Sequence, residues 1–201
     1  MLDKYLVPRL KPHLRTVAVH AQRRGLTANR LTVFGFVIGV ACVPLLALGH
    51  YKTALIFLLL NRLADGLDGE VARLDSPSDA GGYLDITLDF VFYAVFPLGF
   101  ALADPLHNAL PAAVLIASFV GTGASFLAFA IQAQKHSIES PDFGYKSLYY
   151  LNGLAEGTET ILCFALMCLF PAYFPIIAWS FAALCLVTAI NRIYFGFATL
   201  K

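Results

Sequence analysis

Residues 65–89 read DGLDGEVARLDSPSDAGGYLDITLD, and this stretch decides how the whole chain is interpreted. It contains four aspartates, in a protein that is 59% hydrophobic and only 13% charged. Asp65 and Asp68 are three positions apart, and Asp85 and Asp89 are four apart, so on a helix each pair shares one face. The pattern therefore predicts two helices that face each other across an acidic cleft. Small residues at helical spacing from the aspartates leave room in that cleft for a ligand, namely Gly69, Ala72 and Gly81.

Clustered carboxylates repel one another and are costly to remove from water. A hard divalent cation, Mg²⁺ or Mn²⁺, relieves both problems because it prefers carboxylate oxygen as a ligand. We expect the four aspartates to hold such a cation. A diphosphate fits the remaining space, since Mg²⁺ commonly bridges carboxylates and phosphates. The alternative is that the acids lie on helix faces at a membrane surface, solvated or paired with Arg62 and Arg73.

The four aspartates and the small residues among them follow the pattern Asp65-x2-Asp68-Gly69-x2-Ala72-Arg73-x7-Gly81-x3-Asp85-x3-Asp89. This pattern resembles the signature of the CDP-alcohol phosphotransferases, which are integral membrane enzymes of phospholipid synthesis. Every defining position of that signature is present. The rest of the chain is similar to a bacterial inner-membrane branch of the family. The resemblance implies transfer of a phosphatidyl or similar substituted phosphate group from a CDP-linked donor, with CDP-diacylglycerol as the expected donor. An alcohol hydroxyl would accept the group, and CMP would be released.

The resemblance also implies roles for individual residues. Asp89 would ligate the cation and act as general base on the acceptor hydroxyl. Asn29 and Thr32 form an Asn-x-x-Thr element that would help to hold the CDP group. Simple helix capping also explains this element. Ala28 stands where proline is common in the family. Homodimer formation is implied as well. The expected nucleotide-binding residues are Asn29, Thr32, Asp65, Asp68, Gly69, Ala72, Arg73 and Gly81.

Five later residues are candidates for binding the acceptor. Lys135, Lys146 and Arg192 offer cations to an acceptor that bears phosphate. Each of the lysines also fits a simple role as a cytoplasmic anchor. Glu156 and Glu159 offer carboxylates to hydroxyls or to a cationic acceptor, or they stabilise a helix N-terminus. Glycerol phosphate, inositol phosphate, serine and other small alcohols all stay open as acceptors.

The length of 201 residues corresponds to a single domain. Apolar runs close to the ~20 residues that a bilayer requires recur along it. We therefore predict an all-α integral membrane domain of six transmembrane helices over about 31–197, preceded by an interfacial amphipathic helix over 1–24. The predicted spans are 31–49, 53–74, 82–103, 110–134, 153–171 and 175–197.

The first 24 residues combine basic side chains with apolar ones at helical spacing, which predicts a helix on the surface of an anionic membrane. A partly ordered cytoplasmic tail is the alternative. With the N-terminus in the cytoplasm, Lys52 is the one basic residue outside, so the N-terminus and the acidic motif are both expected in the cytoplasm. The apolar residues of the N-terminal pattern are Leu6, Leu10, Leu14, Val17 and Ala21.

Other functional classes are less compatible with the sequence. A net charge of +1 argues against nucleic acid as a partner, and four cysteines without a CxxC pair argue against a disulfide framework or a zinc site. Two alternatives stay open. The same motif serves the reverse reaction, in which a CDP-alcohol transfers its head group to diacylglycerol. Intramembrane carboxylates also mark cation transporters. Arg62 lies within a predicted span, so we expect it to pair with an acid or with a phosphate.

Overall fold

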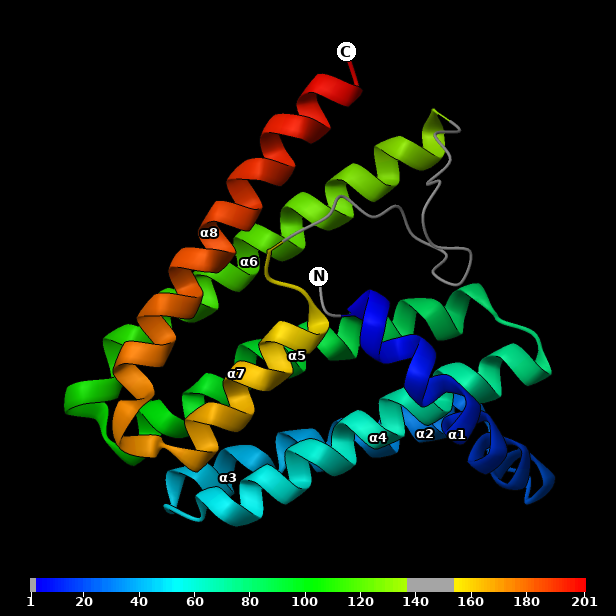
Figure 1. The fold of residues 1–201 in the computed structure, drawn as a ribbon, viewed down its shortest axis with the longest axis horizontal. Helices are drawn as coiled ribbons and strands as arrows, with labels where there is room; N and C mark the ends of the chain where they lie inside the picture. Colours follow the sequence, from blue (N-terminus) through cyan, green and yellow to red (C-terminus); the bar gives the residue numbers. More distant parts are fainter. Residues whose placement is uncertain (1–2, 137–153) are drawn as a thin grey trace.

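The computed structural model of the chain describes residues 3–136 and 154–201 (Figure 1). Those residues form α-helices and one short 3-10 helix without any strand, which confirms the prediction of an all-helical protein. The 3-10 helix, η1, connects the last two α-helices. The elements are α1 (Asp3–Arg23), α2 (Ala28–Val40), α3 (Cys42–Ala47), α4 (Tyr51–Asp75), α5 (Asp79–Ala103), α6 (Pro105–Lys135), α7 (Gly157–Leu169), η1 (Pro171–Tyr173) and α8 (Phe174–Thr199).

Four helical segments in the described part of the chain are long and apolar enough to cross a bilayer. Helix α4 is also long, but it carries the charged residues of the first half of the motif, and α7 has only 13 residues. Each of the six predicted spans therefore coincides with a helix or a pair of helices, whereas membrane crossing by α4 and α7 stays a prediction. The four segments are Ala28–Ala47, Asp79–Ala103, Pro105–Lys135 and Pro171–Thr199.

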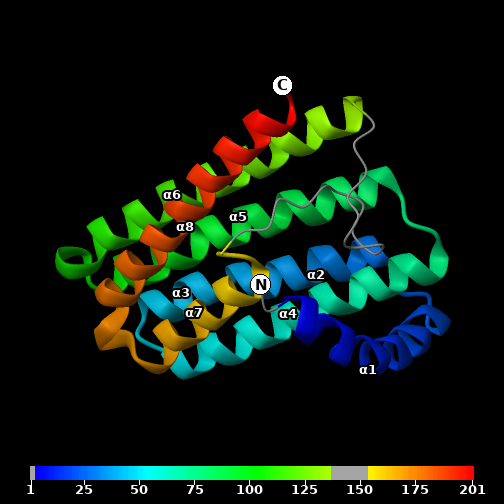
Figure 2. The ribbon, with the colours of Figure 1, turned by 45° about the horizontal axis from the view of Figure 1, so that its top comes forward.

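The predicted N-terminal helix is present as α1, and it packs against α4 (Figures 1 and 2). Leu14 lies against Gly66, where an added Cβ would come within 3.0 Å of the leucine side chain. Ala18 is fully buried, and Gln22 donates a hydrogen bond to Asp75. Val17 belongs to the predicted apolar face but is 51% exposed. Helix α1 therefore packs directly on the helix that carries the first two motif aspartates, while its position on a membrane surface stays a prediction.

A group of stacked aromatic rings fixes the position of α5 within the bundle. Phe92, Phe96 and Phe100 recur every four residues, so they share one face of α5, and all three are buried. The Phe96 ring stacks on Phe164 of α7 at 4.1 Å between centroids, and the Phe100 ring stacks on Phe174 of α8 at 4.5 Å. Such pairs add to the stability gained from apolar burial. The second half of α5 therefore forms the core, and its first half is left to present Asp85 and Asp89.

The link between α4 and α5 is short and reverses the direction of the chain between the two halves of the motif (Figure 1). Ser76 ends α4 with a φ of 106°, in a region that usually favours glycine. Pro77 follows it, and Ser78 caps α5 by accepting a hydrogen bond from the Gly81 N–H at 3.1 Å. The chain thus reverses direction within three residues, so that aspartates of α4 and α5 can reach one common site.

Close packing between α3 and α5 depends on Gly99, and we predict that Gly99→Ala destabilises the protein. An added Cβ would lie 2.6 Å from the Leu46 Cβ and 3.0 Å from the Val43 carbonyl oxygen, so the two helices would have to separate. The expected loss is about 1–3 kcal/mol in the free energy of unfolding, measured by denaturation in detergent. Gly82→Ala is the control, since its Cβ would meet nothing within 4 Å. Equal stability of the two variants would contradict this packing argument.

Candidate metal and nucleotide site

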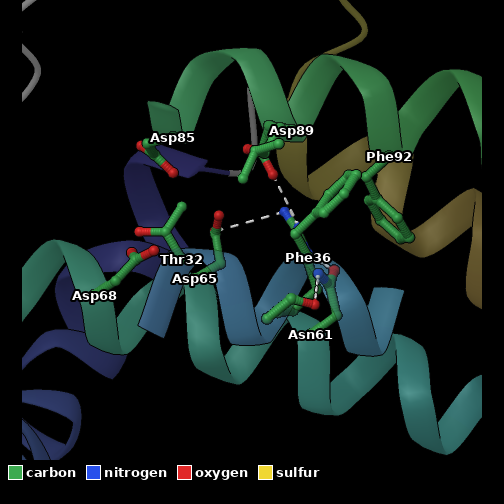
Figure 3. A pocket seen from close by; sticks show the side chains of 11 residues that line it. Thr32, Phe36, Asn61, Asp65, Asp68, Asp85, Asp89 and Phe92 are labelled. Atoms are coloured by element: carbon green, nitrogen blue, oxygen red, sulfur yellow. Dashed lines mark hydrogen bonds and ion pairs between the residues drawn. The ribbon is translucent and has the colours of Figure 1, made fainter. Parts of the chain in front are cut away.

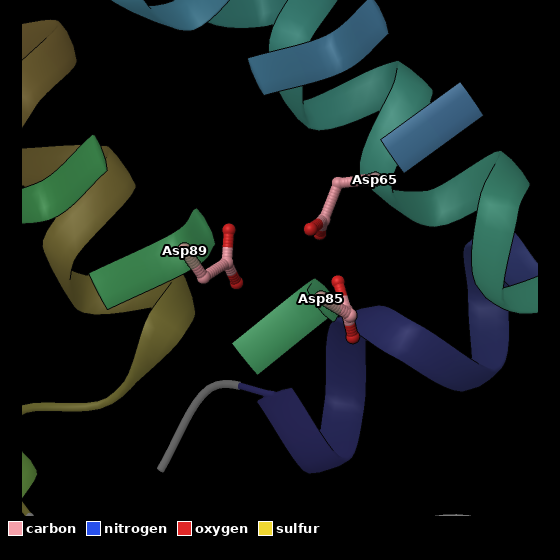
Figure 4. Close-up of side chains that lie close together, drawn as sticks. All are labelled: Asp65, Asp85 and Asp89. Atoms are coloured by element: carbon pink, nitrogen blue, oxygen red, sulfur yellow. The ribbon is translucent and has the colours of Figure 1, made fainter. Parts of the chain in front are cut away.

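Three motif aspartates from two helices converge on one point (Figure 4). Asp65 comes from α4, and Asp85 and Asp89 come from successive turns of α5. One carboxylate oxygen from each lies within 4.8 Å of the others. The side chains are only partly exposed, at 35% for Asp65 and 30% for Asp89. Three partly buried acids at this separation repel one another strongly unless cations lie among them.

A polar pocket contains these three carboxylates and also the fourth motif aspartate (Figure 3). Asp68 is buried, and within the described part of the chain its Oδ2 atom accepts no hydrogen bond. A buried carboxylate oxygen without a partner is costly, so it indicates a ligand that supplies positive charge. The pocket is lined by Thr32, Gly35, Phe36, Asn61, Arg62, Asp65, Asp68, Asp85, Leu88, Asp89 and Phe92.

Small residues on α2 allow that helix to form one wall of the pocket. A Cβ added at Gly35 would lie 2.8 Å from the Ala64 Cβ, and one added at Gly39 would lie 2.8 Å from the Asn61 Nδ2. Neither side chain could be accommodated without separating α2 from α4. The close approach places Thr32 beside the aspartates, one turn before Gly35.

Arg62 is the cation that the structure places among the aspartates. Its NH2 atom donates to Asp89 Oδ1 at 2.9 Å, and its NH1 atom lies 3.5 Å from Asp65 Oδ2. The arginine side chain is 15% exposed. The prediction that Arg62 pairs with an acid is therefore confirmed. One guanidinium offsets only part of the charge of four aspartates, which leaves a net negative site suited to a divalent cation.

Some of the predicted nucleotide-binding residues do not line this pocket. Asn29 lies against Gly81, whose added Cβ would come within 3.0 Å of the Asn29 Oδ1 atom. Gly69 leaves space that the guanidinium of Arg73 occupies at 3.4 Å. Arg73 in turn donates to the buried Glu70 at 2.6 Å. The predicted residues outside the pocket lining are Asn29, Gly69, Ala72, Arg73 and Gly81.

None of the described acceptor candidates lines the pocket. Arg192 is buried on α8, where it donates to the Thr122 carbonyl of α6 at 3.2 Å and lies over the Phe126 ring. Glu156 is buried at the start of α7, and Glu159 is half-buried one turn later. The remaining two are lysines. Lys135 is exposed at the end of α6, and Lys146 falls outside the described residues.

Two residues that support the site were not anticipated from the sequence. Asn61 accepts a hydrogen bond from Arg62 Nε at 2.7 Å and donates to the Gly35 carbonyl at 2.9 Å. Tyr93 accepts from the Arg62 NH1 atom at 3.3 Å. A signal was present, because Asn61 precedes Asp65 by four residues and Tyr93 follows Asp89 by four. Each thus extends the face that carries an aspartate.

The donor set fits a hard divalent cation. Every candidate ligand is a carboxylate oxygen, which Mg²⁺ and Mn²⁺ prefer over nitrogen or sulfur. Three of the carboxylates already converge, and the orphaned Asp68 oxygen lies in the same pocket. Thr32 and Asn61 add neutral polar groups without another positive charge. The arrangement can therefore bind a metal cation together with a ligand that carries phosphate.

Sequence comparison places this site within a known family. The sequence profile of the CDP-alcohol phosphatidyltransferases matches residues 25–191, which include the whole aspartate motif. "Inner membrane protein YnjF" of Escherichia coli is 55% identical over 201 residues, covering 100% of this chain and 98% of that protein. "Archaetidylinositol phosphate synthase" of Pyrococcus horikoshii is 28% identical over 195 residues, covering 96% of this chain and 95% of that protein.

Two solved structures share the fold. Both are of the phosphatidylinositol phosphate synthase PgsA1 of Mycobacterium tuberculosis, which is 18% identical in sequence. The complex with manganese and citrate has a TM-score of 0.72 and covers 92% of this chain and 88% of that one. The structure with CDP-DAG bound has a TM-score of 0.69, with coverage of 92% and 93%. The chain belongs to the CDP-alcohol phosphatidyltransferase family and is a membrane transferase of phospholipid synthesis.

Proposed function

We propose that the protein transfers the phosphatidyl group of CDP-diacylglycerol to the hydroxyl of a small alcohol phosphate. The acceptor oxygen forms a bond to the phosphorus that carries the lipid, and the bond from that phosphorus to the bridging diphosphate oxygen breaks. CMP leaves with the bridging oxygen, and the hydroxyl proton moves to Asp89. Asp89 fits the role of base because it lies in the pocket with the other three aspartates.

The aspartates also suit the role of metal ligands. Asp65, Asp85 and Asp89 would hold a Mg²⁺ or Mn²⁺ ion, and Asp68 would direct its orphaned oxygen to the same ion or to a second one. When bound, the cation would neutralise the diphosphate and stabilise the charge that develops on the departing CMP. The single observation that carries this proposal is the convergence of three carboxylates from two helices beside a fourth whose oxygen is buried and unpartnered.

The nucleotide is proposed to bind at the edge of the pocket where α2 meets the start of α5. Asn29 and Thr32 would contact the CDP group, and Gly69, Ala72 and Gly81 would leave room for it. Arg73 would support the diphosphate with its charge, while Glu70 holds the guanidinium at 2.6 Å. This assignment is supported by the PgsA1 structure with bound CDP-DAG, which shares the fold.

An alcohol phosphate is the favoured acceptor for two reasons. The Pyrococcus horikoshii relative is named an archaetidylinositol phosphate synthase, and PgsA1 is named a phosphatidylinositol phosphate synthase. This chain also holds a buried cation, Arg192, on α8. Lys135, Lys146, Glu156 and Glu159 stay secondary candidates for binding the acceptor. Transfer of a CDP-alcohol head group to diacylglycerol is the alternative reaction, and nothing in the geometry favours it.

A membrane location and an oligomeric state of the chain are also proposed. The chain would form a single membrane domain of six spans, with α1 at the cytoplasmic surface of a bacterial inner membrane. The N-terminus and the aspartates would face the cytoplasm, where CDP-linked lipids and water-soluble acceptors meet. The four apolar helical segments and the similarity to an inner membrane protein support this location. A homodimer is proposed from the family resemblance alone.

The test is CMP release by purified protein in detergent with Mg²⁺, CDP-diacylglycerol and a panel of acceptors. The panel holds glycerol phosphate, inositol phosphate, serine and the unphosphorylated alcohols. We expect release with one alcohol phosphate and little with its unphosphorylated partner. A parallel incubation with CDP-choline or CDP-ethanolamine and diacylglycerol tests the reverse arrangement. Thermal stabilisation by CDP separates both reactions from cation transport, since a transporter should not respond to the nucleotide.

We predict that Arg192→Gln raises the KM for the alcohol phosphate. Loss of a charged hydrogen bond to phosphate should raise it about 10-fold, with the KM for CDP-diacylglycerol nearly unchanged. Steady-state kinetics with each substrate varied in turn would measure both constants. Lys201→Met is a suitable control because Lys201 is exposed and lies just beyond the C-terminal end of α8. An unchanged acceptor KM in the Arg192 variant would remove this residue from the acceptor site.

A further inference from the structure

Arg62 is the centre of a hydrogen-bond network that joins three helices. Its Nε atom donates to Asn61 Oδ1 at 2.7 Å, and Asn61 Nδ2 donates to the Gly35 carbonyl of α2 at 2.9 Å. The NH1 atom donates to the Tyr93 hydroxyl of α5 at 3.3 Å. The NH2 atom donates to Asp89 Oδ1 at 2.9 Å. Every nitrogen of the guanidinium is thus engaged, and the planar group can adopt only one orientation.

Aromatic rings restrict the guanidinium further. Its central carbon lies 5.1 Å from the centre of the Phe92 ring and 5.7 Å from that of Tyr93. Phe92 is almost fully buried in the aromatic core of α5. Cation–π contact and low exposure both favour a fixed position over a mobile one. The network therefore holds the Asp89 side chain in a fixed position relative to the aromatic core.

This network has two consequences for the aspartates. Asp89 Oδ1 is held by the guanidinium, so the rotamer of Asp89 is fixed and Oδ2 is left for the cation or for the acceptor hydroxyl. The permanent positive charge also lies 3.5 Å from Asp65, which lowers the attraction that the cluster exerts on a divalent cation. The first effect favours turnover, while the second weakens metal binding.

We infer that Arg62 is a positioning residue for Asp89 and a built-in counter-charge that weakens metal binding while raising turnover. The inference rests on the proposed function for its kinetic part only. A residue with a merely structural role would affect both properties in the same direction, because a disordered cluster binds metal less well and reacts more slowly. Tighter metal binding together with slower turnover in a variant of Arg62 therefore distinguishes this role from a merely structural one.

The test compares Arg62→Met, which removes the charge, with Arg62→Lys, which keeps the charge and loses the planar fork. For Arg62→Met we expect Mn²⁺ to bind about 10-fold more tightly, because a unit charge near the cluster is lost. Its kcat should fall about 100-fold as Asp89 loses its position. For Arg62→Lys we expect wild-type Mn²⁺ affinity, with kcat reduced about 10-fold or more.

Mn²⁺ affinity is measured on the purified protein by the paramagnetic resonance of free Mn²⁺, without donor or acceptor. Tyr93→Phe is a milder third variant, expected to keep Mn²⁺ affinity and to lower kcat several-fold through the lost 3.3 Å hydrogen bond. Weaker Mn²⁺ binding in Arg62→Met, or an unchanged kcat in Arg62→Lys, would overturn the inference. If the wild-type protein releases no CMP with any acceptor, the proposed function fails, while the Mn²⁺ titration still decides the counter-charge.

Discussion

Asp89→Asn is expected to abolish acceptor-dependent CMP release, with a loss of at least about 10³-fold in kcat. The amide cannot take the proton from the acceptor hydroxyl, and it replaces an anionic ligand with a neutral one. The hydrogen bond from Arg62 NH2 at 2.9 Å to Oδ1 can be kept by the amide oxygen, so the fold should persist. Rate assays at saturating CDP-diacylglycerol and acceptor, together with CDP-induced thermal stabilisation, would separate lost chemistry from lost binding.

Asp79→Asn is the matched control for this variant. Asp79 begins the same helix and is exposed, and it does not line the pocket. It should therefore keep its activity to within about a factor of two, as surface substitutions usually do. Retention of more than a tenth of the wild-type rate by Asp89→Asn would mean that another group acts as the base.

The second large effect is expected for Asp85→Asn. This change removes one of the three convergent carboxylates and keeps the guanidinium contacts of Arg62 to Asp65 and Asp89. Loss of an anionic ligand should weaken Mn²⁺ binding about 100-fold and lower activity at ordinary metal concentration by about 10³-fold. Activity should recover in part when the Mn²⁺ concentration is raised, because the base is still present.

The metal dependence separates Asp85 from Asp89. A plot of rate against Mn²⁺ concentration should shift to higher metal for Asp85→Asn, whereas for Asp89→Asn the maximum itself should fall. Removal of metal by a chelator should reduce the wild-type protein to the same level as Asp89→Asn. If Asp85→Asn bound Mn²⁺ as tightly as the wild type, the metal site would need to be assigned to other residues.

The positions of the helices along the chain could be predicted because they depend on residues close together in the sequence. Apolar runs and turn residues located the helices, and spacings of three and four placed each aspartate pair on one face. The predicted spans 53–74 and 82–103 leave a break between them, and the structure has its chain reversal there. The boundaries differed by a few residues, since α6 begins at Pro105, ahead of the predicted 110, and α7 begins at Gly157, after the predicted 153.

The grouping of the aspartates could be predicted only in part. The sequence predicted all four in one cleft, and all four do line one pocket. It could not separate Asp68 from the convergent three, because that depends on the rotation of α4 against α5. Glycines on α2 allow the close packing that sets this rotation, since a Cβ added at Gly39 would lie 2.8 Å from the Phe92 ring. Hydrophobic periodicity does not reveal such close approaches.

Long-range partners were the least predictable feature. Arg62 was expected to pair with some acid, but its choice of Asp89, 27 residues away, depends on tertiary packing. The hydrogen bond from Arg192 to the Thr122 carbonyl spans 70 residues and was not predicted at all. The contact of Leu14 with Gly66 likewise links two helices that the sequence had treated as separate units.

The most direct measurement is phosphorus magnetic resonance of CDP-diacylglycerol incubated with the purified protein, Mg²⁺ and the acceptor panel. The account predicts that the two diphosphate signals disappear together, while one signal of CMP and one of a new phosphodiester grow in equal amounts. Omission of the divalent cation should stop both changes. A diphosphate that stays intact with every acceptor, or that is cleaved equally well without a divalent cation, would contradict the account.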